Sequence, residues 1–109
     1  MIGYKQSLGK YGEDAAAEFL KKKKYKIVER NFRNKFGEID IIAEYKKDII
    51  FIEVKTRLSK EYGEPYEAVN YYKQRKLVNT AKAYLYSKKM FDTNVRFNMV
   101  YGIKFKSSI

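Results

Sequence analysis

The sequence predicts an α/β protein in which helices flank a mixed sheet. Two segments space their apolar residues as helices do, and four segments have the composition or alternation of strands. Their order along the chain is α-β-β-β-α-β, which is typical of helices packed on a sheet. With 109 residues the chain has the size of one domain, so we expect a single domain over residues 1–109.

The first predicted helix covers residues 7–24, "SLGKYGEDAAAEFLKKKK". At 100° per residue one stripe of this helix collects small and apolar residues, namely Leu8, Gly12, Ala15, Ala16, Phe19 and Leu20. The Lys21–Lys24 run is interpreted as the solvated end of the helix. The segment that follows, "YKIVERNF" at residues 25–32, is rich in strand-forming residues and predicts a strand.

Residues 37–57, "GEIDIIAEYKKDIIFIEVKTR", predict two strands joined at Lys46 and Lys47. A turn centred between these lysines places Asp40 directly across from Glu53. A two-residue turn needs positive φ angles, for which two lysines are a poor choice, so a longer loop with the same register is also compatible.

Alternation of side chains then gives this hairpin one polar and one apolar face. The polar face carries Glu38, Asp40, Glu53 and Lys55. The apolar face is predicted to become core and carries Ile39, Ile41, Ala43, Ile50, Ile52 and Val54. A slip of one residue would bury the acids and expose the isoleucines, so the register is well specified.

The remaining elements are a loop at residues 61–69, a second helix and a last strand. The helix is predicted over residues 68–89, with its inward side formed by Leu77, Val78, Ala81 and Leu85. The last strand is predicted over residues 94–105, where large apolar residues alternate from Val95 to Phe105.

Composition excludes several kinds of chemistry. The chain has no cysteine and no histidine, which excludes disulfides, thiolate or imidazole zinc sites, and nucleophiles activated by histidine. Catalysis would have to use carboxylates, lysines, tyrosines or a hard metal ion bound by carboxylates. No signal peptide or membrane-spanning apolar run is visible, so we expect a cytoplasmic protein that does not enter a membrane.

The charge distribution indicates the class of partner. The net charge is +11, yet five acids lie between residues 38 and 53. A basic surface suits a polyanion, and nucleic acid is the commonest one in a cytoplasm. An ordinary lysine-rich surface is the alternative. Residues placed to contact phosphates are Arg57, Lys60, Lys73, Arg75 and Lys76, although each could equally be a plain solvated residue. Gln74 is a further candidate for nucleic-acid binding.

Two carboxylates directly across from each other repel, so the Asp40–Glu53 pair is explained best by a cation between them. Oxygen ligands select Mg²⁺ or Mn²⁺. Lys55 could orient or deprotonate a water molecule, or stabilise charge on a phosphate. The alternative is that Glu53 and Lys55 form a surface ion pair. Glu13 could add a third carboxylate from the edge of the first helix's apolar stripe, or it could be an ordinary rim glutamate.

Gln74 lies near the centre of the second helix's apolar stripe. A buried amide needs hydrogen-bond partners, which could be at the site or elsewhere in the core.

These residues resemble the PD-(D/E)xK nuclease signature. More closely, "GKYGEDAAAEFL", "ERNFRNKFGEIDIIA", "FIEVKTR" and "RFNMV" resemble the YraN-like family of predicted endonucleases, which is similar to archaeal Holliday junction resolvases. The resemblance implies a restriction-endonuclease-like fold, with Glu13, Asp40 and Glu53 binding divalent metal and Lys55 assisting the attacking water. The chain has Asn98 where the family usually has aspartate in "RFD".

The sequence therefore predicts a metal-dependent endonuclease acting on DNA, including branched or processed structures. A nucleic-acid-binding module without catalysis is the alternative, and a small scaffold protein in a larger complex is a third interpretation. Cutting two strands symmetrically would require a homodimer.

Overall fold

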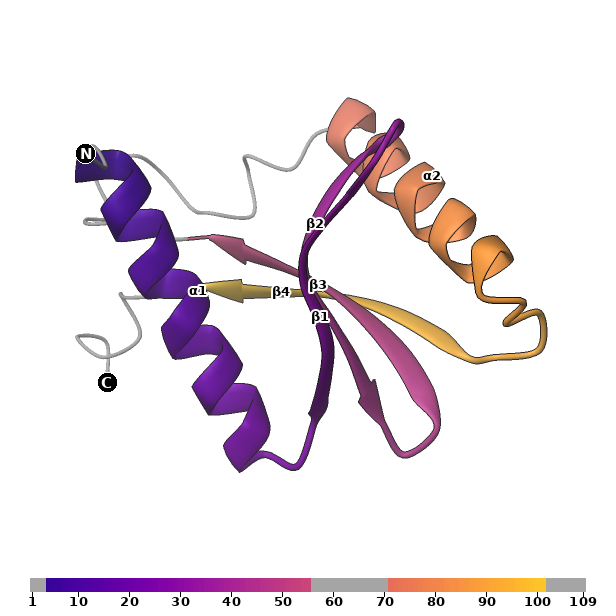
Figure 1. The fold of residues 1–109 in the computed structure, drawn as a ribbon, viewed down its shortest axis with the longest axis horizontal. Coiled ribbons are helices and arrows are strands. Elements are labelled where there is room, and N and C mark those ends of the chain that lie inside the picture. The colour runs from indigo at the N-terminus through magenta and orange to yellow at the C-terminus, as the bar shows by residue number, and fades with distance from the viewer. Residues whose placement is uncertain (1–3, 56–70, 102–109) are drawn as a thin grey trace.

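The computed structural model describes residues 4–55 and 71–101 (Figure 1). Its elements in chain order are α1 (Tyr4–Lys22), β1 (Lys26–Asn34), β2 (Gly37–Tyr45), β3 (Asp48–Lys55), α2 (Tyr71–Ser87) and β4 (Val95–Tyr101). This order confirms the predicted α/β class. The loop predicted at residues 61–69 and the end of the last predicted strand lie outside the described residues.

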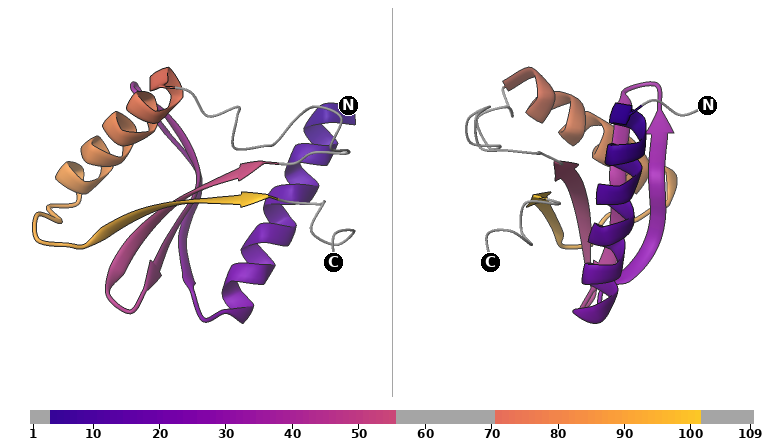
Figure 2. Two further views of the ribbon diagram at one scale, coloured as in Figure 1. Left: turned by 180° about the vertical axis from the view of Figure 1, so that it is seen from behind. Right: turned by 90° about the vertical axis from the view of Figure 1, so that its left-hand side faces the viewer.

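The four strands form one mixed sheet in the order β1-β2-β3-β4. β1, β2 and β3 are antiparallel neighbours, whereas β4 runs parallel to β3. A parallel neighbour requires a crossover connection, and α2 lies in that connection. α1 covers one face of the sheet and α2 covers the other, as two further views show (Figure 2).

Each helix packs over its own part of the core. The α1-side core consists of Ala16, Ala17, Leu20, Ile41, Ala43, Ile50 and Ile52. The α2-side core consists of Ile39, Ile42, Ile49, Phe51, Ala81 and Tyr84. Because β3 contributes to both cores, its residues 49–52 form an uninterrupted apolar run, as expected for a strand that is covered on both faces.

The buried side of α1 differs from the predicted stripe. Phe19 was expected to face the core but is 51% exposed, and the Lys23 ammonium lies over its ring. Ala17 is buried in its place. The helix approaches the sheet through its small residues, and a phenylalanine ring on that line would hold the helix away from the strands.

The β2–β3 hairpin has the predicted register, with Ile41 opposite Ile52 and Ala43 opposite Ile50. Tyr45 pairs with Asp48, so the two strands are joined by a two-residue turn of Lys46 and Lys47. The alternative of a longer loop does not apply. Lys46 and Lys47 both adopt positive φ, at 50° and 75°. The lysines thus accept the backbone conformation that such a turn requires.

The prediction of one polar and one apolar face is wrong for the far end of this hairpin. Ile39 belongs to the α2-side core and Ile41 to the α1-side core, although regular alternation would put both on one face. β2 therefore changes the direction of its side chains at Asp40, between these two isoleucines.

The side chains of the neighbouring strand β1 also change direction, at Asn31. Arg30 pairs with Asp14 of α1, whereas Phe32 packs edge-on against Tyr84 of α2, with ring centroids 5.2 Å apart. Between them Asn31 adopts a positive φ of 54°. The C-terminal end of β1 and the N-terminal end of β2 therefore direct their apolar side chains toward α2.

Candidate active site

Asp40 marks the place where β2 and β3 separate. Their ladder runs from the turn to the pair Ile41–Ile52. Past that pair, the Asp40 Oδ2 accepts a hydrogen bond of 2.7 Å from the backbone N–H of Val54. The carboxylate thus satisfies a β3 donor that β2 would otherwise pair. Asp40 and Glu53, and likewise Glu38 and Lys55, are consequently not the ladder pairs that the sequence predicted, because the strands diverge before reaching them.

Burial is the main influence on Asp40. It raises the pKa of the carboxyl, and the Val54 hydrogen bond acts in the opposite direction. The negative charge of Glu38 also raises this pKa, and the positive charge of Lys55 lowers it. A partly buried carboxylate among other acids is electrostatically unfavourable, which is common at functional sites.

Glu53 and Lys55 follow on β3. The Lys55 Nζ lies 4.0 Å from the Glu53 Oε2, and both side chains are largely withdrawn from solvent. Burial, followed by the charge of Asp40, raises the pKa of Glu53 to about 6, although Lys55 and Lys73 lower it. The neighbouring cations therefore offset the burial and the repulsion only in part.

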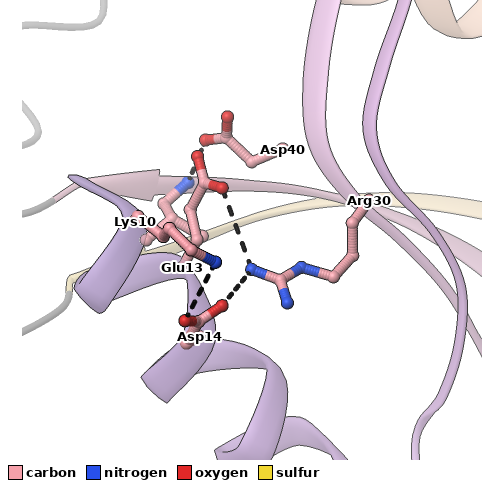
Figure 3. A network of polar contacts seen from close by, with 6 residues as sticks. Lys10, Glu13, Asp14, Arg30 and Asp40 are labelled. Atoms are coloured by element: carbon pink, nitrogen blue, oxygen red, sulfur yellow. Dashed lines mark hydrogen bonds and ion pairs between the residues drawn. The ribbon is translucent and has the colours of Figure 1, made fainter. Parts of the chain in front are cut away.

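Glu13 reaches Asp40 from α1. Figure 3 shows the two carboxylates pointing toward one another, with Arg30 of β1 beside them. Burial raises the pKa of Glu13 most, Asp40 raises it further, and Arg30 lowers it. The Arg30 Nη2 is 2.7 Å from the Asp14 Oδ1 and 3.9 Å from the Glu13 Oε1. Asp40 is thus close enough to affect the pKa of both glutamates.

A groove of about 460 Å³ lies on the α2 face of the sheet, and both Glu53 and Lys55 line it. Its other cationic lining residues are Arg33, Lys35, Lys73 and Lys76. Leu77 and Met99 add apolar surface, Phe36 comes from the β1–β2 turn, and Gly37 is the first residue of β2. The concave surface therefore combines positive charge with an acid–lysine pair.

The carboxylates at this site meet the requirements of a hard metal ion only in part. Asp40, Glu53 and Glu13 offer carboxylate oxygens, the ligands that Mg²⁺ and Mn²⁺ prefer. Within residues 4–55 and 71–101, however, no three acids are gathered closely enough to form a metal cluster. Mg²⁺ commonly needs only one or two protein carboxylates, together with water and substrate phosphate. Asp40 and Glu53 are the residues that could supply them.

Comparison with known proteins identifies relatives over most of the chain. A model of the family described as "Uncharacterised protein family UPF0102" matches residues 12–101. The chain belongs to the UPF0102 family. It is 48% identical over 96 residues to a UPF0102 protein of Caldanaerobacter subterraneus subsp. tengcongensis, an alignment that covers 88% of this chain and 79% of the relative.

Other UPF0102 proteins are equally similar. One from Clostridium acetobutylicum is 52% identical over 92 residues, covering 84% of this chain and 75% of the relative. One from Fusobacterium nucleatum subsp. nucleatum is 50% identical over 93 residues, covering 85% and 78%. The resemblance to the YraN-like family is thereby confirmed.

The phosphate contacts predicted for this UPF0102 protein have different positions. Lys73 and Lys76 line the groove, Arg75 and the further candidate Gln74 are exposed on α2 without lining it, and Arg57 and Lys60 lie outside the described residues. The expectation of a buried Gln74 amide is wrong, because the first turns of α2 are exposed and burial begins with Thr80.

Sequence reasoning missed the β1–β2 turn. It brings Lys35 and Phe36 to the groove, beside Arg33 at the end of β1. The available signal was the Asn34–Gly37 segment, whose end residues are typical of turns.

Asn98, where the resemblance implies an aspartate, lines another recess. That recess lies on the α1 side, beside Phe19, Leu20 and Tyr45. Glu53 and Lys55 do not line it. The Asn98 difference therefore lies away from the groove.

Neither α1 nor α2, the two described helices, combines the length and apolarity needed to span a bilayer.

Proposed function

We propose that this UPF0102 protein is a metal-dependent endonuclease that hydrolyses phosphodiester bonds of DNA, including branched or processed structures. The observation that carries the proposal is the position of Glu53 and Lys55. They lie 4.0 Å apart on the wall of a basic groove, next to a second partly buried acid, Asp40. Acids whose pKa is raised by burial and by a neighbouring like charge are common at functional sites.

A divalent ion would be held by Asp40 and Glu53, with Glu13 available directly or through water. The free energy of such binding would include relief of the repulsion that now raises the pKa of both glutamates. When bound, Mg²⁺ or Mn²⁺ supplies a water of lowered pKa and polarises a phosphoryl oxygen.

The chain's own residues have separable roles in this proposal. The Val54 N–H holds one oxygen of Asp40, which fixes the carboxylate in the fork between β2 and β3. The ammonium of Lys55 would orient the attacking water or stabilise charge that develops on the phosphate. The groove cations, including Lys73 and Lys76, would hold the backbone of the strand.

Cleavage assays test the proposal. The substrates are end-labelled branched, single-stranded and duplex DNA, each with Mg²⁺, Mn²⁺ or EDTA. Asp40→Asn and Lys55→Ala should each reduce metal-dependent cleavage by at least about 100-fold, as expected when a site loses charge stabilisation or a positioned proton-transfer group. Lys82→Ala is the matched control, because Lys82 is an exposed α2 lysine that does not line the groove. Parental rates in both site variants would refute the assignment.

A nucleic-acid-binding module without catalysis is the second candidate. It is favoured by the lack of a three-acid cluster in the described residues. Calorimetry with Mn²⁺ separates the two candidates. A folded protein that takes up no Mn²⁺, and whose Asp40→Asn variant keeps its DNA affinity, would be a binding module.

A further inference from the structure

We infer that the groove accepts an unpaired nucleotide, whose base stacks on Phe36 while the groove cations contact its phosphates. The inference rests on the proposed function, because that proposal assigns nucleic acid to the groove. It adds that the protein selects unpaired DNA and that Phe36 is the residue responsible for this selectivity.

Phe36 occupies an unusual place for a phenylalanine. It lies in the turn between β1 and β2, where glycine, asparagine and aspartate are the common residues. Its side chain is 42% exposed and lines the groove. The Lys35 ammonium lies 5.3 Å from the ring centroid. A phenyl ring next to a cation, at the edge of a groove, is well suited to a ligand that has both a flat face and a negative charge.

The turn that carries Phe36 is anchored to α2. Asn34 Oδ1 accepts a hydrogen bond of 2.9 Å from the Phe36 N–H, and Asn34 Nδ2 donates one of 3.4 Å to the Thr80 carbonyl. Gly37 has a φ of 156°, and a Cβ there would lie 2.8 Å from the Thr80 Oγ1. These contacts fix the backbone of the turn before any ligand arrives, which reduces the entropy lost on binding.

The rest of the groove complements a nucleotide. Leu77 and Met99 provide apolar surface in the same groove, and Lys73 and Lys76 provide positive charge from α2. A volume of about 460 Å³ is typical of a site for a small molecule. In a continuous duplex both faces of each base are covered by neighbouring base pairs. A base inside a duplex can therefore offer a face to Phe36 only when it is unpaired.

The experiment measures binding in EDTA, so that it does not depend on cleavage. The probes are a fluorescent single strand of eight deoxyadenosines, a strand of eight abasic sites, and an eight-base-pair duplex whose ends are both closed by base-free linkers. Phe36→Ala should weaken binding of the deoxyadenosine strand about tenfold, as expected for loss of one stacked base. Its affinity for the abasic strand and the duplex should stay at the parental value. Phe36→Trp should restore binding of the deoxyadenosine strand.

Phe91→Ala is the matched control. Phe91 is 69% exposed and does not line the groove, so the change should leave all three affinities unaltered. Parental affinity of Phe36→Ala for the deoxyadenosine strand would overturn the inference. An equal loss on the abasic strand would also overturn it, because the ring would then not act through a base.

The endonuclease proposal and the stacking proposal can be refuted independently of each other. Phe36-dependent binding in a protein that cleaves no DNA would refute the endonuclease and support the stacking site. Metal-dependent cleavage by a protein whose Phe36→Ala variant binds normally would do the reverse.

Discussion

The Asp40 carboxylate accepts a hydrogen bond of 2.7 Å from the Val54 N–H at the point where β2 and β3 separate. This bond makes Asp40 a structural residue as well as a candidate metal ligand. Variants that keep or remove the acceptor should therefore separate the two roles.

Asp40→Asn should preserve the fold and Asp40→Ala should not preserve it equally well. An asparagine oxygen can accept the Val54 hydrogen bond, whereas alanine leaves that partly buried donor unpaired, at a cost of about 1–3 kcal/mol. Urea denaturation gives the two free energies of unfolding, and both variants should lack cleavage. Equal stability of the two variants would show that the hydrogen bond does not hold the fork.

Glu53 should make the stability of the metal-free protein depend on pH. Its pKa is about 6 in the folded protein against an ordinary 4.5, so between these values the folded state binds more protons than the unfolded state. Stability should therefore fall as pH rises from 4.5 to 6, by about 1 kcal/mol. Glu53→Gln should lack this fall, so its stability relative to the parent should increase with pH.

Urea denaturation in EDTA at several pH values measures this effect. Glu18→Gln is the control, since it removes one carboxylate from an exposed position on α1. A parallel pH dependence in the parent and Glu53→Gln would contradict the burial of Glu53.

Gly37→Ala should destabilise the protein by about 1–3 kcal/mol. The added Cβ would meet the Thr80 Oγ1 at 2.8 Å, and the φ of 156° is unfavourable for alanine. Thr80→Ala removes the steric contact but leaves the backbone strain. Thermal unfolding of the single and double variants should thus show partial rescue in the double variant. Additive losses of stability in the double variant would mean that the Cβ added at position 37 makes no steric contact with the Thr80 side chain.

Arg30→Met should raise the pKa of Glu13 further, because the guanidinium now lowers it. Carboxyl carbon NMR titration of the metal-free protein measures this pKa directly. Arg33→Met is the matched control, since Arg33 pairs with Glu38 at 2.9 Å and not with Glu13. An unchanged Glu13 titration in Arg30→Met would place the guanidinium outside the electrostatic environment of Glu13.

The sequence was sufficient to predict the elements and the central register. Alternation of isoleucines fixes which residues face each other near the turn, and Ala43 lies opposite Ile50 as predicted. The register is local and is enforced by burial, so it can be read from a pattern of period two.

The fork at Asp40 could not be predicted in the same way. It depends on the positive φ of Asn31 and on the packing of Ile39 and Phe32 against α2, which are contacts between distant parts of the chain. Regular alternation put Glu38, Asp40 and Glu53 on one face. The structure instead places Asp40 between the strands, close enough to affect Glu13 and Glu53.

Crystals of the full chain grown with Mn²⁺ test the central claim most directly. An anomalous difference map should show an ion bound by oxygens of both Asp40 and Glu53, each at about 2 Å. Saturating Mn²⁺ that leaves no peak between these two carboxylates, or that binds only elsewhere, would contradict the account.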